Sequence, residues 1–134
     1  MKLVIDSNMI IAALIRDSVC RRLILHNRFS FFCPDFCLEE INKYKPLILK
    51  KSSLSKNNLN KILSILFENI QVVSKEKYEL YLKKASEEID DKKNTPFVAL
   101  ALSQSFDGIW FDDKDFDKVK SVKVYRTKEL ITFF

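Results

Sequence analysis

The 134-residue sequence predicts an α/β fold with three layers, in which helices cover both faces of a mainly parallel central sheet. Short β-branched or aromatic runs alternate with segments of helical periodicity along the whole chain, which is typical of such a sheet. Hydrophobic residues make up 47% of the chain, enough for one well-packed core. No linker, repeat or low-complexity segment divides the chain, so we expect one domain over residues 1–134.

The N-terminal segment is predicted to form a strand, a tight turn and a helix. Leu3-Val4-Ile5 is an apolar, β-branched run typical of buried parallel strands, and it ends at Asp6. Ser7 or Asn8 can cap a helix whose apolar residues extend from Met9 to Ile15. Asp6 is therefore expected at the carboxyl end of the first strand, which is the edge where open α/β sheets bind ligands.

A second unit of the same kind follows. We expect a helix from Val19 to about Asn27, and the aromatic run Phe29–Cys33 is typical of a strand. Pro34-Asp35 then begins a helix whose apolar residues recur at helical spacing. Glu40 interrupts that apolar face, whereas its neighbour Glu39 points about 100° away around the axis and is expected in solvent.

The middle of the chain is predicted to place a strand between two helices. Ser55 can cap a helix with apolar residues from Leu59 to Phe67, and Ile70–Val73 suits a short strand. Lys75–Ile89 has the pattern of one amphipathic helix, and Asp90–Lys93 is a charged loop.

The C-terminal third continues the alternation. The apolar run from Pro96 to Leu102 predicts a buried helix, with Asn94 and Thr95 at its start. Gly108 marks the turn into the strand Ile109–Phe111. Val122–Tyr125 is expected to form a last strand, and Thr127 to cap a terminal helix that reaches Phe134. We expect the aromatic side chains of Phe97, Trp110 and Phe116 in the core and not on a surface that stacks bases.

Composition narrows the class of protein. The longest apolar runs are too short to span a bilayer, and Asp6 interrupts the signal-like start, so we expect a cytoplasmic protein away from membranes. The net charge of +5 is consistent with a polyanionic partner, and lysines crowd Lys43–Lys61 and Lys114–Lys128, although a solvated surface is the simpler explanation for them. Three cysteines cannot form a closed disulfide framework, and Cys33 with Cys37 has no second pair to complete a zinc site.

Four acids occupy positions where a carboxylate is costly. Asp6 ends a strand, Glu40 lies on an apolar helix face, and Asp113 and Asp115 directly follow a buried strand. Gathered carboxylates raise one another's pKa unless a cation compensates them, and Mg²⁺ prefers such hard oxygen ligands. A bound Mg²⁺ or Mn²⁺ could position a water for phosphodiester hydrolysis.

Other interpretations stay open for each acid alone. Asp6 could be a helix cap, Glu40 a surface residue, and Asp113 with Asp115 an Asp-rich turn. Ser/His/Asp or Cys/His catalysis is not indicated, because the chain's single histidine lies in a helix unrelated to the acids.

Four segments together resemble the PIN domain family, in the same order and over nearly the whole chain. They are Val4-Ile5-Asp6-Ser7-Asn8, Leu38-Glu39-Glu40-Ile41, Thr95-Pro96-Phe97-Val98-Ala99-Leu100-Ala101-Leu102 and Ile109-Trp110-Phe111-Asp112-Asp113-Lys114-Asp115-Phe116. The resemblance implies a metal-dependent nuclease that often acts on RNA. Many small prokaryotic members are VapC-type toxins that a cognate antitoxin inhibits, and they are commonly dimeric.

Residue by residue, the resemblance implies Asp6, Glu40 and Asp113 as catalytic residues. The same three with Asp115 would be the metal ligands. Ser7 and Asn8 would support Asp6 by hydrogen bonding. The function expected on this basis is an Mg²⁺-dependent ribonuclease, as the toxin of a toxin–antitoxin pair.

One position departs from the family's pattern. An acid usually precedes the segment that matches Thr95-Pro96, and this chain has Asn94 there. An amide still suits a helix N-cap but is a weaker Mg²⁺ ligand, so Asp90 or Asp91 would have to compensate. The alternative is a catalytically weakened PIN domain that binds RNA or a protein.

Two further α/β classes with acids at strand ends fit less well. A receiver domain would have an adjacent acid pair after the first strand, where this chain has Asp6-Ser7, and a haloacid-dehalogenase-type phosphatase would have Asp in place of Asn8. Lys43 or Lys114 could contact an RNA substrate.

Overall fold

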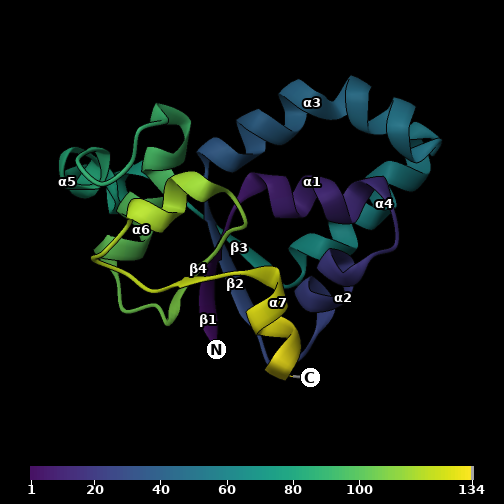
Figure 1. Ribbon diagram of the computed structural model, residues 1–134. Helices are drawn as coiled ribbons and strands as arrows, with labels where there is room; N and C mark the ends of the chain where they lie inside the picture. Colours follow the sequence, from purple (N-terminus) through teal and green to yellow (C-terminus); the bar gives the residue numbers. More distant parts are fainter. Residues whose placement is uncertain (134) are drawn as a thin grey trace.

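The computed structural model describes residues 1–133, and within them five parallel strands form one sheet (Figure 1). The strand order is β3-β2-β1-β4-β5, and every neighbouring pair is parallel. The strands are β1 (Lys2–Ile5), β2 (Ser30–Pro34), β3 (Ile70–Val73), β4 (Gly108–Trp110) and β5 (Val124–Tyr125). The predicted parallel sheet is confirmed.

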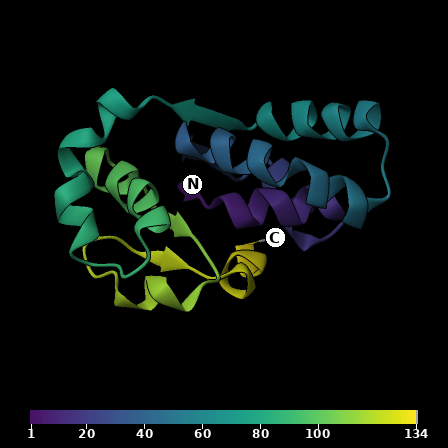
Figure 2. The same cartoon turned by 90° about the horizontal axis from the view of Figure 1, so that it is seen from above.

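Helices cover both faces of this sheet. Figure 2 shows α5 and α6 on one side of the strands and α1, α3 and α4 on the other, which confirms the three-layer α/β/α arrangement. The α-helices are α1 (Ser7–Ile15), α2 (Val19–Leu25), α3 (Phe36–Ser52), α4 (Lys56–Phe67), α5 (Leu82–Ser86), α6 (Thr95–Ser103) and α7 (Thr127–Leu130). Short 3₁₀ helices lie at Lys75–Lys77, Glu79–Tyr81, Lys92–Asn94, Lys114–Lys118 and Ile131–Phe133.

Strand β1 lies at the centre of the sheet. Leu3, Val4 and Ile5 are fully buried, as expected for a strand with neighbours on both edges and helices on both faces. The chain passes from β1 to β2 and β3, and then returns to β4 on the opposite side of β1. This reversal makes the carboxyl ends of β1 and β4 the switch point at which such sheets bind ligands.

The core contains the aromatic residues expected there. Phe97, Trp110 and Phe116 are all fully buried, so the prediction that they pack inside is confirmed. Gly108 begins β4 close to the neighbouring strand, where an added Cβ would lie 2.6 Å from the carbonyl oxygen of Lys123. Only glycine therefore fits this approach of β4 to β5 without a backbone shift.

The segment Lys75–Ile89 differs from its prediction. It forms two 3₁₀ helices and the short helix α5 instead of one long amphipathic helix. Asp35 explains the break, because its carboxylate accepts the Tyr78 hydroxyl at 2.5 Å and the Lys75 backbone N–H at 3.1 Å. These bonds hold the start of the segment against the N-terminus of α3.

Several element ends also differ by one or two residues, which is usual where hydrogen bonding frays. Strands β2 and β4 are shifted by one residue from the predicted Phe29–Cys33 and Ile109–Phe111, helix α2 ends at Leu25, and β5 is only Val124–Tyr125. Helix α7 ends at Leu130 and a 3₁₀ helix follows it, while the predicted endpoint Phe134 lies outside the described residues.

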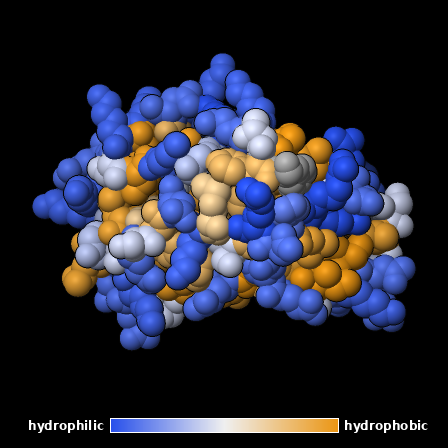
Figure 3. Space-filling model, turned by 90° about the horizontal axis from the view of Figure 1, so that it is seen from below, coloured by the Kyte–Doolittle hydropathy of each residue, from blue (hydrophilic) through white to orange (hydrophobic). Residues whose placement is uncertain are grey.

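The surface carries a few large apolar side chains. Figure 3, which views the underside of Figure 1, shows hydrophobic groups between hydrophilic ones. Leu25 of α2 and Ile65 of α4 are 46% and 48% exposed, and these two helices are in contact. Across residues 1–133, every helix is too short or too polar to cross a membrane.

Candidate active site

Two of the predicted acids follow neighbouring strands at the switch point. Asp6 comes directly after β1, and Asp113 follows β4 by three residues. The strands are in parallel register, with Ile5 opposite Trp110, so both acids leave the sheet at the same edge. The sheet thus brings together carboxylates that are more than one hundred residues apart in the sequence.

Asp6 is the N-cap of α1. Its Oδ2 accepts the backbone N–H of Asn8 at 3.1 Å, and the residue is only 3% exposed. Ser7, one of the two predicted caps, is instead the first helical residue, and Asn8 contributes its backbone rather than its exposed side chain. Asn8 therefore supports Asp6 as expected, but through its main chain.

Glu40 reaches this edge from α3. The Ser7 hydroxyl donates to its Oε1 at 2.7 Å, so the side chain of Ser7 supports Glu40, and only the backbone N–H of Ser7 acts on Asp6. Partial burial raises the pKa of Glu40, and the bond from Ser7 opposes that rise. The charges of Lys93 and Lys43 also lower this pKa, whereas the charge of Asp91 raises it.

The electrostatics of Asp6 link the three acids. Burial raises the pKa of Asp6 well above its usual range, while the N–H groups of Asn8 and Ser7 only partly oppose this. The negative charges of Glu40 and Asp113 raise it further. Glu40 and Asp113 therefore both lie within electrostatic reach of Asp6, and a cation beside Asp6 would relieve both its burial and this repulsion.

Asp113 is the most accessible of these acids. It is exposed and caps the 3₁₀ helix Lys114–Lys118, where its Oδ1 accepts the backbone N–H of Asp115 at 2.9 Å. Within the described residues, no protein hydrogen bond reaches its other carboxylate oxygen, Oδ2. That oxygen is available to a ligand.

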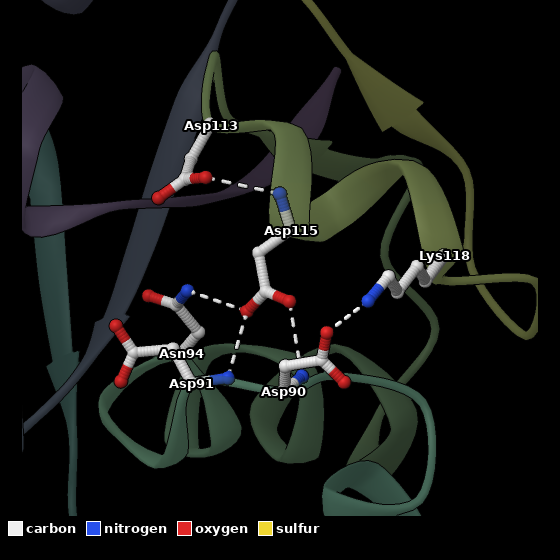
Figure 4. A network of polar contacts seen from close by, with 6 residues as sticks. All are labelled: Asp90, Asp91, Asn94, Asp113, Asp115 and Lys118. Atoms are coloured by element: carbon white, nitrogen blue, oxygen red, sulfur yellow. Dashed lines mark hydrogen bonds and ion pairs between the residues drawn. The ribbon is translucent and has the colours of Figure 1, made fainter.

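Asp115 has a different environment from the one expected of a metal ligand. Its Oδ1 accepts the N–H of Asp90 at 2.9 Å, and its Oδ2 accepts the N–H of Asp91 at 3.2 Å and the Asn94 amide at 2.9 Å. Figure 4 shows its carboxylate turned toward the loop before α6. Both oxygens are therefore already used to hold that loop.

Asn94 lies in the N-cap position of α6 without capping it through its side chain. The residue is 7% exposed, and its amide donates to Asp115 instead. The expectation that its side chain caps the helix is therefore wrong. The physical reason is the backbone, because the 3₁₀ helix Lys92–Asn94 runs directly into α6 and leaves Asn94 with helical instead of extended dihedral angles, from which its side-chain oxygen does not accept a helix N–H.

The two acids considered as substitutes for Asn94 have separate roles. Asp90 is exposed and forms an ion pair with Lys118. Asp91 caps the 3₁₀ helix Lys92–Asn94 by accepting the Lys93 N–H at 3.0 Å, and its charge acts on Glu40. Of the two, Asp91 is thus the one whose charge reaches Glu40.

The acidic set is open rather than closed around a cavity. Across residues 1–133, no three acidic, cysteine or histidine side chains lie close enough to enclose a metal ion as they stand. Carboxylate oxygens are nevertheless the donors that Mg²⁺ prefers, and Mg²⁺ usually keeps several waters and needs only one or two direct carboxylates. The donor chemistry therefore fits a hydrated ion.

A second polar cluster was not foreseen. The Thr127 hydroxyl donates to Asp112 Oδ2 at 2.7 Å and accepts the Trp110 indole N–H at 2.9 Å, and its backbone N–H reaches Asp112 Oδ1 at 2.9 Å. Thr127 was expected to cap the terminal helix, but Arg126 occupies the N-cap position. The cluster fixes α7 to the segment that leads from β4 to Asp113.

The fold and the site define a class of protein, an all-parallel α/β domain with carboxylates at its switch point. Residues 4–132 match the family model of the PIN domain, and the chain belongs to the PIN domain family. The resemblance seen in the four segments of the sequence is thereby confirmed.

The fold also matches a solved structure. A chain in the crystal structure of VapBC2 from Rickettsia felis, bound to a DNA fragment from their promoter, superposes with a TM-score of 0.71. The match covers 94% of this chain and 98% of that chain at 13% sequence identity, a level at which it shows the fold alone. No curated protein sequence matches the chain.

Proposed function

We propose that this PIN domain is a metal-dependent endoribonuclease that hydrolyses RNA phosphodiester bonds. One observation supports the proposal above all others. Asp6 is buried beside the charges of Glu40 and Asp113, and no lysine or arginine within the described residues forms an ion pair with it. A protein that keeps such a costly charge at a ligand-binding edge is typically using it to bind a cation.

Mg²⁺ is the proposed cation, and Mn²⁺ could replace it. Asp6, Glu40 and Asp113 would hold it, since each has a carboxylate directed to this edge by a strand end or a helix. When bound, the metal supplies an activated water and neutralises charge on the phosphate. Asp115, expected as a fourth ligand, is left out of this set because the loop occupies both its oxygens.

The chain's own residues orient the acids. The Asn8 N–H holds Asp6, the Ser7 hydroxyl holds Glu40, and the Asp115 N–H holds one oxygen of Asp113. Each bond leaves carboxylate lone pairs free, because a carboxylate has about four acceptor positions. The acids would therefore meet a metal with little loss of rotamer freedom.

Basic residues near the acids would bind the RNA backbone. The charges of Lys43 and Lys93 act on Glu40, and Lys114 lies next to Asp113. Lys114 and Lys128 also line a surface hollow of about 630 Å³, which Arg126 shares with Asp112 and with its ion-pair partner Asp117. Together with the net charge of +5, this arrangement suits a polyanion that passes the acidic edge.

We further propose that the chain is a VapC-like toxin of the cytoplasm, with a cognate antitoxin and a second copy of itself as partners. The fold likeness to the Rickettsia felis VapBC2 structure motivates this role. Exposed apolar side chains such as Leu25 and Ile65 would be covered in such complexes. Co-expression with the neighbouring reading frame, followed by a mass measurement of the complex in solution, tests both partners.

A second candidate function rests on Asn94. Because its amide nitrogen is committed to Asp115, residue 94 does not supply the charged ligand that the family usually has there. A catalytically weakened domain that binds RNA or a protein would fit this loss. Tight RNA binding without cleavage would favour it.

The test is cleavage of a mixed RNA by the purified chain in Mg²⁺, in Mn²⁺ and in EDTA. We expect metal-dependent cutting with phosphate monoester ends and no 2′,3′-cyclic phosphate, because water and not the RNA 2′-hydroxyl is the nucleophile. Asp6→Asn should lower the rate at least a hundredfold, and the exposed control Asp17→Asn should not. Cleavage that survives EDTA, or cyclic ends, would reject the proposal.

A further inference from the structure

We propose that Asp115 is a positioning residue matched to Asn94, and that this pair holds the loop before α6 so that Asp91 takes the place of the missing acid. The inference rests on the proposed function, since Asp91 serves as an acid only if the site binds a metal. It assigns a separate role to each of Asp115, Asn94 and Asp91.

The contacts of Asp115 carry the first step. Its carboxylate accepts three N–H groups, from the Asn94 side chain and from the backbone of Asp90 and Asp91, at 2.9 to 3.2 Å. Three of about four acceptor positions are thereby used. A metal ion could bind both carboxylate oxygens of Asp115 only by displacing the loop. The carboxylate therefore positions the loop and does not contact the reacting groups.

The chemistry of Asn94 carries the second step. Asn94 is nine-tenths buried and donates its amide N–H to Asp115, as Figure 4 shows. An aspartate at position 94 would replace this donor with a second carboxylate at the same contact, and the two charges would repel. The amide at 94 and the carboxylate at 115 therefore complement each other as donor and acceptor.

The direction of the loop carries the third step. Because Asp115 holds the Asp90 and Asp91 backbone, the two side chains leave the loop in different directions, and Asp90 pairs with Lys118. In Figure 4 the Asp91 carboxylate points away from Asp115. Its charge raises the pKa of Glu40, which places Asp91 within electrostatic reach of that one proposed ligand.

The experiment compares Asn94→Asp, Asp115→Asn and the double variant that exchanges the two side chains. In the metal-free chain of 134 residues, hydrogen exchange at the Asp90 and Asp91 amides reports on the pair without any need for activity. We expect each single variant to speed exchange at least tenfold. The exchanged pair restores one donor and one acceptor, so it should recover a large part of the protection.

Mn²⁺ affinity and RNA cleavage are measured as well, because both would stay unchanged if Asp91 had only a structural role in the loop. Asp91→Asn should weaken Mn²⁺ binding at least tenfold and lower kcat, with amide exchange unchanged. The matched control Asp90→Asn, in the same loop, should change neither the Mn²⁺ affinity nor kcat. Asn94→Asp should lower Mn²⁺ affinity, and the exchanged pair should partly rescue it.

Two results would overturn the inference. Higher Mn²⁺ affinity or faster cleavage in Asn94→Asp, with the amides still protected, would show that position 94 is a ligand position and not half of a pair. Unchanged exchange in Asp115→Asn would show that Asp115 does not hold the loop. If the wild-type chain binds no Mn²⁺ and cuts no RNA, the proposed function and the role of Asp91 fail, while the exchange data still decide the pair.

Discussion

Ser7 donates its hydroxyl hydrogen to Glu40 Oε1 at 2.7 Å, and this bond joins the end of the central strand to helix α3. It connects the residue next to Asp6 with an acid 33 residues further along the chain. The position of Glu40 relative to Asp6 is therefore set by a single side-chain contact in addition to helix packing, and that contact can be removed by one mutation.

Ser7→Ala should move the acid limb of the pH–activity profile to higher pH. Burial raises the pKa of Glu40 and the Ser7 bond lowers it, so removing the donor raises this pKa further. Because metal binding needs ionised Glu40, activity then appears only at higher pH. The measurement is kcat/KM against pH for both proteins. Ser103→Ala removes a similar bond to the Leu100 carbonyl and serves as the control; an unchanged or lower midpoint in Ser7→Ala would refute the contact's role.

Asp6→Asn should stabilise the metal-free protein while it abolishes activity. The folded-state pKa of Asp6 is raised, so its stability contribution is fully present below the unfolded-state pKa and is lost as pH rises through the folded-state value. Ionisation of Asp6 therefore costs the folded, metal-free protein stability. Asn removes the charge and keeps an oxygen for the Asn8 N–H, so the cap is retained.

The measurement for Asp6→Asn is thermal unfolding in EDTA. A gain of 1 kcal/mol corresponds to about 3–5 °C in Tm for a chain of this size, and we expect a rise of at least that size. Asp17→Asn, an exposed acid in a loop, should leave Tm unchanged. A lower Tm in Asp6→Asn would mean that the Asp6 carboxylate does not destabilise the metal-free protein.

Thr127→Val should destabilise the protein by about 1–3 kcal/mol. The substitution keeps the shape of the side chain but leaves the buried Trp110 N–H without its acceptor and takes a donor from Asp112. Urea unfolding of Thr127→Val and Thr132→Val compares this site with an exposed threonine that bonds only to the nearby Glu129 carbonyl. An equal loss of unfolding free energy in both variants would show that the cluster around Thr127 does not stabilise the fold.

Local patterns were enough to predict much of the acidic site. Asp6 and Asp113 follow buried strands, and Glu40 lies on a helix face, so each position depends mainly on the element that carries it. In a parallel sheet the strand ends converge at one edge, which brings the two aspartates together. Family membership and the three-layer fold followed from the same alternation of elements and from the four matching segments.

The departures come from contacts between distant segments. Asp115 bonds to residues 21 to 25 positions earlier, and no local pattern could reveal that its oxygens are occupied. In the same way, Tyr78 bonds to Asp35, 43 residues away, and this contact interrupts a segment whose periodicity is that of a helix. Such bonds depend on how helices, strands and loops pack against one another in the folded chain, which local sequence patterns do not show.

The most direct test of the account is anomalous diffraction from crystals of the chain soaked in millimolar Mn²⁺. The account predicts a manganese peak at the carboxyl edge of β1 and β4, with Asp6, Glu40 and Asp113 as its protein ligands, and no such peak in Asp6→Asn crystals. The absence of any peak there, or a peak that persists without the Asp6 charge, would contradict it.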